Sequence, residues 1–474
     1  MKPRDRYRCV VALGVSLIGA CAATPPSAPA DPKGNAQAFA ARRLDGALSD
    51  LPAPAGGWSR EEWFRAALLL NPQLAEARAS ALAVAAGERT AAERPNPNLN
   101  LFGEYVTAAA GGAGWLYGLS VDFLLPRRGE RARAMAAAAL ETQAAESDVA
   151  EKIWQVRSEV QQALLDVAYA HDETALLKHL VADRAALAAS SRALAAAGEI
   201  AKVESLTQEL ELAHERQRLA QAQALGADAE ARLAAAVGVS VAALDGVPVR
   251  WEGWADIGSL TPKLSSEWRN DALIGRPKLV RALREYDLAE NALQSEVAKR
   301  WPQLHVTPGY AWDKSGARQD ASDDTLHDTL HDNELGLSVD LPIFNRHEGP
   351  IGEALARREA AGEHLQAVQA EFFEEIERAE RAWPQARAAW QEVSGAMTLA
   401  ERQHASEEHS FKAGVIDRPT LLIADLAARE AELASLEAAY NAELAFGALE
   451  NAYRRPLDGT EHKLAMRPSV SGHS

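Results

Sequence analysis

Two histidines lie four residues apart in the tandem repeat DTLHDTLH, which raises the question of a metal site. His327 and His331 share this interval with three acids, Asp324, Asp328 and Asp332. On a helix, residues i and i+4 lie on the same face, so two imidazoles flanked by carboxylates could bind a transition metal. The spacing therefore defines a candidate metal site, and the other interpretation of this stretch is a polar loop.

Two further motifs resemble catalytic ones but lack the required spacing or context. HASEEH, residues 404–409, has one residue more than the zinc-binding HxxEH pattern, which places its imidazoles roughly 140° apart around a helix. GGAGWLYG, residues 111–118, precedes a predicted strand, whereas a phosphate-binding loop opens a helix. The sequence also contains no GxSxG, HExxH or P-loop motif. We therefore expect neither enzymatic activity nor a cofactor.

Composition and charge favour a helical protein that does not bind nucleic acid. Hydrophobic residues make up 47% of the 474 residues and aromatic residues only 6%, with alanine dominating, which favours close-packed helices. The formal net charge of −17 argues against nucleic acid as a partner, because phosphate binding requires a basic surface.

The N-terminus predicts export and a lipid anchor. Residues 1–20 combine a basic start, a short apolar run and the small-residue sequence IGA, which is typical of a signal peptide. IGA followed by Cys21 resembles a bacterial lipoprotein signal, in which that cysteine becomes the lipidated N-terminus. An ordinary secretory signal with an incidental cysteine is the alternative. Residues 21–57 are rich in Pro and Ala and are expected to form an extended, unpacked tether.

The main part of the chain contains two copies of one sequence pattern. GLSVD occurs at 118 and again at 336, each time after a strand-like segment and before a long alanine-rich segment, with matching turns at 196–206 and 412–422. We expect a first repeat at 58–245, a linker at 246–262, a second repeat at 263–455 and a flexible tail at 456–474. Each repeat is predicted to run helix, strand, strand, long helix, turn, helix.

Four segments alternate between apolar and polar residues with a period of two. In the GLSVD segments the small or polar positions, expected to face water, are Gly118, Ser120, Asp122, Gly336, Ser338 and Asp340. Such strands suit a membrane barrel with lipid outside and water inside, and alternation alone fits a soluble sheet equally well. Four strands cannot close a barrel, so a membrane sheet requires two or three copies, giving eight or twelve strands.

Two segments with almost no helix breaker, 129–197 and 349–413, predict two helices, each roughly 100 Å long. Leucines spaced by seven indicate coiled-coil seams, and Gly198 and Gly414 mark where each helix reverses into a partner. Pro384 is expected to kink the second helix.

From about Trp58 to Arg455 the chain resembles the TolC family of outer-membrane efflux proteins. The resemblance rests on NPQL and RPKL at helix starts, WPQL at the third strand, GLSVDLPIFNRHEGPIGEALARREA after it, and AGEI and AGVI at the helical turns. It implies a mainly α-helical fold with a small transmembrane β part, namely four barrel strands per chain and long antiparallel coiled-coil helices. It further implies a homotrimer whose barrel of twelve strands, set in outer-membrane lipid, continues into a periplasmic α-helical tunnel.

By the same resemblance the chain would be the passive exit duct of a tripartite efflux system. An inner-membrane pump of the RND type would deliver substrate through a periplasmic adaptor, also called a membrane fusion protein. LPIFNRHEGPI is similar to the LPLF-(D/N)-RN-QG segment of CzcC-like members, which predicts heavy-metal cations as substrate, although His347 and Glu348 replace Asn and Gln. Efflux of organic compounds, a type I secretion duct and a periplasmic coiled-coil adaptor are the alternatives.

The helical turns match the tips where family members meet the adaptor and constrict the tunnel. The residues carried over are Gly198, Glu199, Ile200, Leu206, Gly414, Val415, Ile416 and Leu422. The family's acidic ring cannot be carried over, because Thr420 and Ile423 occupy its positions. The histidine repeat is then expected in an outer loop between a strand ending near Trp312 and one beginning near Glu334, and metal binding by His327 and His331 remains the alternative.

Overall fold

A computed structural model describes residues 29–44, 58–107, 113–247, 249, 251, 253–313 and 330–457. The chain divides into two compact units, residues 1–42 and residues 43–474. In the first unit, α2 (Pro32–Ala40) begins where the Asp31 carboxylate accepts a hydrogen bond from Gly34 N at 3.0 Å and proline occupies the first helical position. The expected extended tether is therefore wrong over these nine residues.

The second unit confirms the duplication element by element. The first half contains α4 (Arg60–Leu70), α5 (Pro72–Ala92), β1 (Asn98–Thr107), β2 (Ala113–Leu125), α6 (Glu130–Ala197) and α7 (Lys202–Val237). The second half repeats them as α8 (Ser266–Ile274), α9 (Pro277–Ala298), β3 (Gln303–Asp313), β4 (Leu330–Asp340), α10 (Glu348–Lys412) and α11 (Arg418–Tyr453). The short helices α4 and α8 were not expected from the sequence, because Pro72 and Pro277 mark the helix starts that dominate the pattern.

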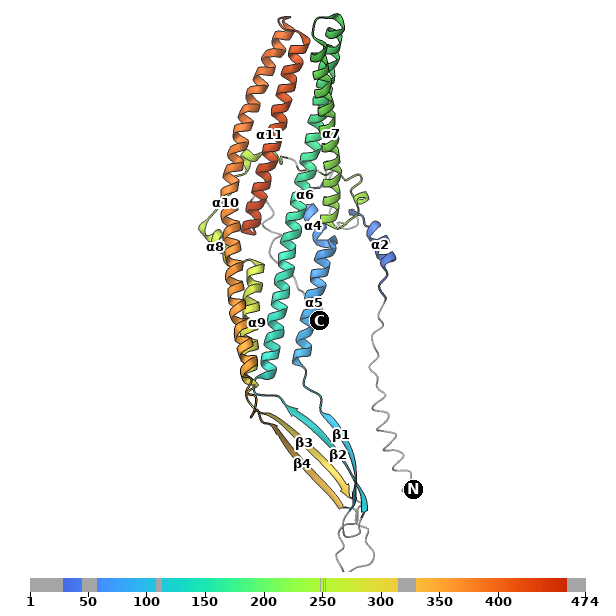
Figure 1. Ribbon diagram of the computed structural model, residues 1–474, viewed down its shortest axis with the longest axis vertical. Coiled ribbons are helices and arrows are strands. Elements are labelled where there is room, and N and C mark those ends of the chain that lie inside the picture. Colours follow the sequence, from blue (N-terminus) through green and yellow to red (C-terminus); the bar gives the residue numbers. More distant parts are fainter. Residues whose placement is uncertain are drawn as a thin grey trace, which may run out of the picture. The chain divides into compact units, whose positions relative to one another are not determined.

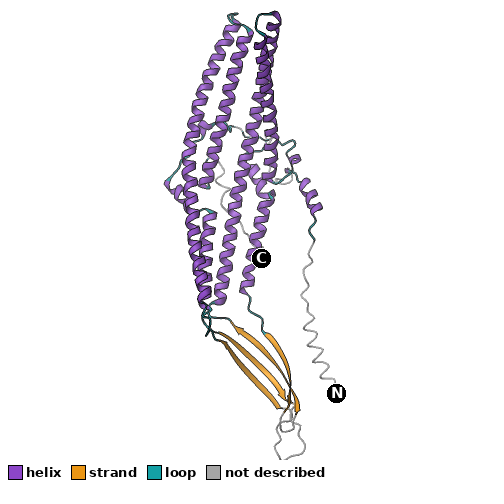
Figure 2. Ribbon diagram, viewed as in Figure 1, coloured by secondary structure: helices purple, strands orange, loops and turns teal. Residues whose placement is uncertain are grey.

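Within this unit, helices and strands occupy opposite ends (Figures 1 and 2). The strands form one antiparallel sheet in the order β1-β2-β3-β4, so β2 pairs with β3 although α6 and α7 separate them in sequence. The helices α6 with α7 and α10 with α11 form two antiparallel hairpins. Pro384 lies inside α10, which stays helical on both sides of it.

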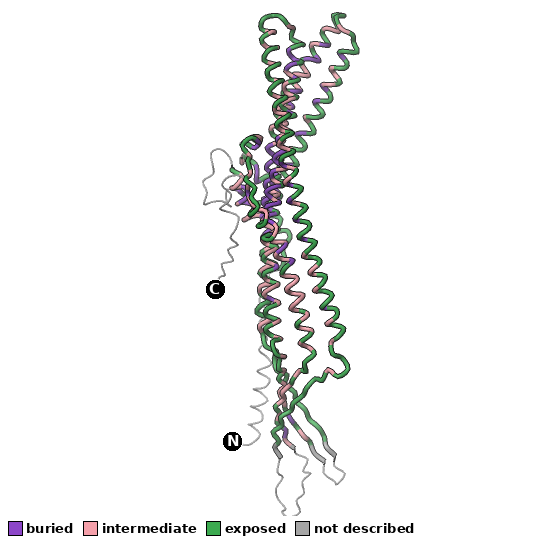
Figure 3. Tube along the Cα trace, turned by 90° about the vertical axis from the view of Figure 1, so that its left-hand side faces the viewer, coloured by how far each residue is buried: buried purple, intermediate pink, exposed green. Residues whose placement is uncertain are grey.

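Hydrophobic contacts hold the hairpins together, and the buried residues gather mainly around the middle of the helical part (Figure 3). Leu180 and Leu187 of α6 pack against Leu422, Leu426 and Leu433 of α11, which confirms the predicted heptad seam and shows that it joins the two repeats. Many contacts in the remaining clusters involve alanine, so the helices can approach closely.

The segment between the repeats packs firmly against the bundle. Two short 3-10 helices lie between α7 and α8: Val241–Ala243 at the end of the first repeat and Ile257–Ser259 in the linker. Trp254 and Ile257 are buried against α6, α10 and α11, and Trp251 contacts two separate hydrophobic clusters. Packing of this segment therefore connects the two halves of the bundle. Of the predicted flexible tail, Leu457 packs on the same core, and residues 458–474 lie outside the described part.

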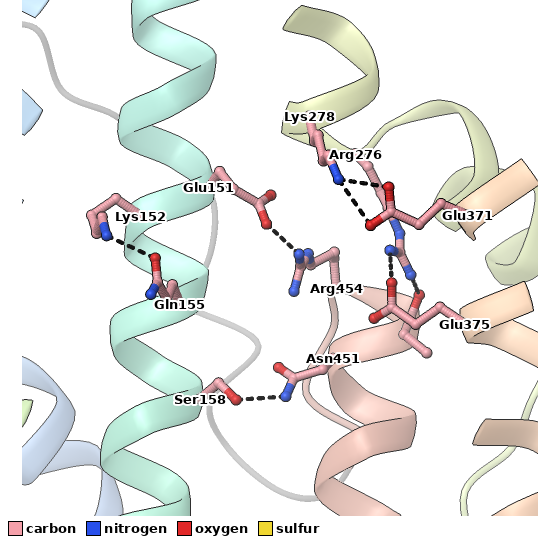
Figure 4. A network of polar contacts seen from close by, with 11 residues as sticks. Glu151, Lys152, Gln155, Ser158, Arg276, Lys278, Glu371, Glu375, Asn451 and Arg454 are labelled. Carbon is pink, nitrogen blue, oxygen red and sulfur yellow. Dashed lines mark hydrogen bonds and ion pairs between the residues drawn. The ribbon is translucent and has the colours of Figure 1, made fainter. Parts of the chain in front are cut away.

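Polar contacts between helices reinforce the middle of the bundle (Figure 4). Arg454, after α11, pairs with Glu151 of α6, and Asn451 donates to Ser158 Oγ at 2.6 Å. Arg276, which is fully buried, pairs with Glu375 and stacks over the Phe372 ring at 4.2 Å from its centroid. Burial lowers the pKa of Arg276, and the ion pair with Glu375 opposes that shift.

No helix among the described residues combines the length and apolarity needed to cross a lipid bilayer.

Glu450 offers a direct test of this polar core. It is fully buried and accepts hydrogen bonds from Gln161 Nε2 at 2.8 Å and Arg157 at 3.2 Å. Glu450→Ala would remove the buried carboxylate that pairs with Arg157 and accepts from Gln161, so we expect a loss of about 3–5 kcal/mol in unfolding free energy. Thermal unfolding in detergent by circular dichroism measures it, with the exposed Glu432→Ala in the same helix as control. Equal melting of the two variants would contradict this role.

Candidate functional site

The sheet has one apolar and one polar face, as the alternation predicts. Large apolar side chains of all four strands are exposed on the first face: Leu99, Leu101, Tyr105, Trp115, Tyr117, Leu119, Phe123, Leu304, Tyr310, Leu335, Leu337 and Val339. Tyr105, Trp115, Tyr117 and Trp312 form a chain of ring contacts across three strands, with centroids 5.2 to 6.2 Å apart. A single chain thus leaves a wide apolar surface uncovered.

The polar face is closely packed around its glycines. A Cβ on Gly118 would lie 2.2 Å from the Phe102 ring, which explains why the first GLSVD segment needs glycine there. Gly118 is buried, Ser120 and Asp122 are partly buried, and Gly336, Ser338 and Asp340 are exposed. The six positions expected to face water lie on this side of the sheet.

The structure also brings together a polar cluster that the sequence did not reveal. Asp122 of β2 accepts a hydrogen bond from Thr307 Oγ1 at 2.9 Å and lies 3.1 Å from His305 Nδ1, both on β3. The alternation places each residue on the polar face. Their meeting depends on the register between β2 and β3, in which Phe123 lies opposite Val306.

At the far end of the helices, both turns are closed by the same backbone motif. Gly198 and Gly414 adopt φ of 78° and 73° in the left-handed region. Glu199 N donates to Leu194 O and Val415 N donates to Ser410 O, each at 2.9 Å. These 6→1 bonds are Schellman caps, which favour glycine because it has no Cβ penalty there.

Beyond the glycines the two tips differ. Asp417 caps α11 by accepting from Thr420 Oγ1 at 2.6 Å and Thr420 N at 3.0 Å, and these bonds hold the pKa of its carboxyl below the usual value. The equivalent residue before α7 is Ala201, which has no capping side chain. The second tip therefore has a firmer helix start than the first.

Apolar exposure also differs between the predicted tip residues. Leu206 is 52% exposed, whereas its counterpart Leu422 is 2% exposed and packs in the seam with α6. Leu422 is thus a core residue, and its place among the docking residues was wrong. Val415 is exposed, while Ile200 and Ile416 are half-buried.

The structure changes the predicted location of His331, one of the two histidines of the tandem repeat. His331 lies in β4, where its backbone pairs with Trp312, because the strand begins at Leu330, earlier than expected. The prediction that His331 belongs to a loop was therefore wrong, and His327 lies outside the described residues, as do residues 1–20 and Cys21. Within the described part, no three His, Cys, Asp or Glu side chains converge to hold a metal ion.

Of the two HASEEH histidines, His404 hydrogen bonds to Asp425 across the α10–α11 hairpin, whereas His409 is exposed.

Comparison with known proteins gives a family match for part of the chain and a fold match for most of it. Residues 268–453 match the model of the outer membrane efflux protein family. No curated protein sequence matches the chain. Among solved structures, a membrane protein from Pseudomonas aeruginosa is 18% identical with a TM-score of 0.68, and the match covers 91% of this chain and 99% of that one.

Two further solved structures have the same fold. The MtrE outer membrane channel of Neisseria gonorrhoeae, in its open state, is 17% identical with a TM-score of 0.67, and the match covers 84% of this chain and 89% of that one. The CmeC outer membrane channel of Campylobacter jejuni is 15% identical with a TM-score of 0.64, covering 91% and 94%.

A duplicated unit of two strands and a long helical hairpin, with a two-faced sheet, defines the TolC-type channel fold. The match to the outer membrane efflux protein model is confined to residues 268–453, and the first half of the chain repeats the same succession of elements.

The tip geometry predicts a local effect of Gly198→Ala. Nothing lies within 4 Å of a Cβ at this position, so the cost comes from the left-handed backbone alone, about 1–2 kcal/mol. We expect faster amide hydrogen exchange in the first tip, measured by mass spectrometry. Gly395→Ala, in open space within α10, is the matched control and should slow exchange, because alanine stabilises a helix. Slower exchange at the tip in Gly198→Ala would refute the argument.

Proposed function

We propose that this protein is the outer-membrane exit duct of a tripartite efflux system. The observation that carries the proposal is the sheet: four antiparallel strands with an apolar face and a polar face, continued at one end by long helical hairpins. An apolar outer face suits lipid, and a polar inner face suits a water-filled passage.

The sheet edges support assembly into a trimer. Among the described strands, β1 and β4 each pair on one side only. Unpaired backbone groups are prohibitively costly in lipid, so the outer edge of β4 must pair with β1 of a neighbouring copy until the sheet closes. Three copies give twelve strands, the arrangement that the resemblance to TolC implies, and the hairpins of the three copies would then enclose a tunnel.

The transport role that fits this architecture is passive. The substrate would be delivered by an inner-membrane pump of the RND type through a periplasmic adaptor. Exposed apolar residues near the hairpin tips, Val203, Leu206, Leu210 and Val415, offer the adaptor a surface that loses water on docking. The first tip exposes more of this surface, and its helix start lacks a side-chain cap.

The duct would be held in the outer membrane by its barrel and by a lipidated Cys21. The IGA-Cys21 sequence supports this anchor. The intact mass of the mature protein tests it, since an unmodified N-terminus would rule the anchor out.

A reconstituted bilayer tests the pore directly. The purified protein should conduct ions, and Asp122→Asn combined with Asp340→Asn should lower the ratio of cation to anion permeability, because both carboxylates lie on the polar face. The reversal potential in a salt gradient measures that ratio. Leu337→Ala, on the opposite face, is the control and should leave it unchanged. Absence of conductance in every preparation would refute the duct.

The cargo we propose is heavy-metal cations, supported by the CzcC-like segment LPIFNRHEGPI. Deleting the gene should lower tolerance to zinc, cobalt or copper, measured as growth inhibition, and the wild-type gene should restore it. Altered tolerance to organic compounds with unchanged metal tolerance would identify a multidrug duct. Loss of a secreted protein would identify a type I secretion duct.

A further inference from the structure

Basic residues gather where the strands meet the helices, although the chain as a whole is acidic. Four segments converge there: 93–97 (ERPNP), 126–133 (PRRGERAR), 299–302 (KRWP) and 341–348 (LPIFNRHE). They contain eight Lys and Arg residues against three Glu, in a protein with a formal net charge of −17. We name these four segments the junction belt.

Hydrogen bonds tie the segments of the junction belt to one another. Arg127 Nε donates to Trp301 O at 2.9 Å, which joins the end of β2 to the start of β3. Arg300 Nε donates to Arg346 O at 3.2 Å, and Arg131 donates to Ala92 O, at the end of α5, at 2.6 and 3.0 Å. Backbone carbonyls carry no net charge, so these bonds position the guanidinium groups without neutralising them.

Within the described part of the chain, none of the seven arginines in the junction belt forms an ion pair with a carboxylate. Arginines of the helical bundle do so repeatedly, as in Arg157 with Glu450, Arg429 with Asp183 and Arg454 with Glu151. Lys299, in contrast, pairs with Glu296. The positive charge of the seven arginines is therefore left for a partner outside the chain.

The junction belt also exposes large apolar side chains. Trp301 is 72% exposed and Phe344 is 98% exposed, and Ile343 and Leu341 are exposed beside them. They continue the apolar face of the sheet, where Leu304 and Val339 are exposed. Aromatic and basic residues side by side at the end of an apolar band are typical of a membrane–water interface.

We propose that the junction belt binds the phosphate headgroups of anionic phospholipids at the inner surface of the outer membrane. Phe344 and Trp301 would enter the boundary between headgroups and acyl chains, and the arginines would pair with phosphates, which fixes how deeply the barrel sits. The proposal rests on the proposed function, because it needs the strands to lie in lipid.

Three arginines allow a test that spares the junction itself. Arg94, Arg128 and Arg346 are exposed, and their side chains are not among those that tie the segments together. The variant is Arg94→Gln, Arg128→Gln and Arg346→Gln together. The control replaces three exposed arginines of the helical hairpins, Arg216→Gln, Arg381→Gln and Arg402→Gln, with the same change of charge.

The measurement is the lipid retained by the protein. Wild type and variants are extracted from vesicles of equal phosphatidylglycerol and phosphatidylcholine, washed, and their bound lipids quantified by mass spectrometry. We expect wild type and control to enrich phosphatidylglycerol about ten-fold and the junction variant to lose most of that enrichment. For wild type, the enrichment should also fall as washing salt rises from about 0.05 to about 0.5 M, a readout that needs no variant.

Conductance of the same preparations separates the outcomes. If the wild-type protein conducts but retains both lipids equally, the proposed lipid binding by the junction belt is wrong and the proposed function stands. Wild-type protein that never inserts or conducts overturns the proposed function and the junction belt with it. If the junction variant keeps its phosphatidylglycerol while the ion selectivity of the pore changes, the arginines face the passage and the proposal is wrong.

Discussion

The hydrogen-bonding groups along the free edges of β1 and β4 are the constraint on which the rest of the structure depends. Each strand pairs on one side, and the apolar face between them is uncovered over four strands. In water such a surface would aggregate, and in lipid such edges cannot remain open. A single chain therefore leaves two strand edges and an apolar face without partners among the described strands, which is why the proposed function needs further copies.

In the proposed assembly, that constraint also gives a reason for the extensive packing between the two repeats in the helical part. Neighbouring copies can align their strand edges only if the sheet keeps a fixed position relative to the helices. The leucine seam between α6 and α11, the segment around Trp251 and Trp254, and the charge pairs of Arg276 and Arg454 hold the two repeats in one arrangement. The arginine-to-carbonyl bonds at the strand ends extend this hold to the sheet.

The hairpin tips contrast with this firm middle. Two Schellman turns of the same geometry end in different ways: Asp417 caps α11, and α7 starts without a side-chain cap. Leu422 joins the seam while Leu206 stays exposed. A duplicated sequence has thus produced two different tips, one packed against the core through Leu422 and one with Leu206 exposed.

The sequence by itself determined the duplication, the strand faces, the long helices and the glycine turns, because these depend on local periodicity and backbone freedom. It missed α4 and α8, and it expected an extended tether where Asp31 and Pro32 start a helix. It also placed His331 in a loop and Leu422 at a docking surface. Only the tertiary structure decided that β2 pairs with β3, that Asp122 meets His305 and Thr307, and that seven arginines share one junction. These contacts join residues from about 40 to nearly 200 positions apart, and such meetings depend on strand register and helix packing, which no local pattern encodes.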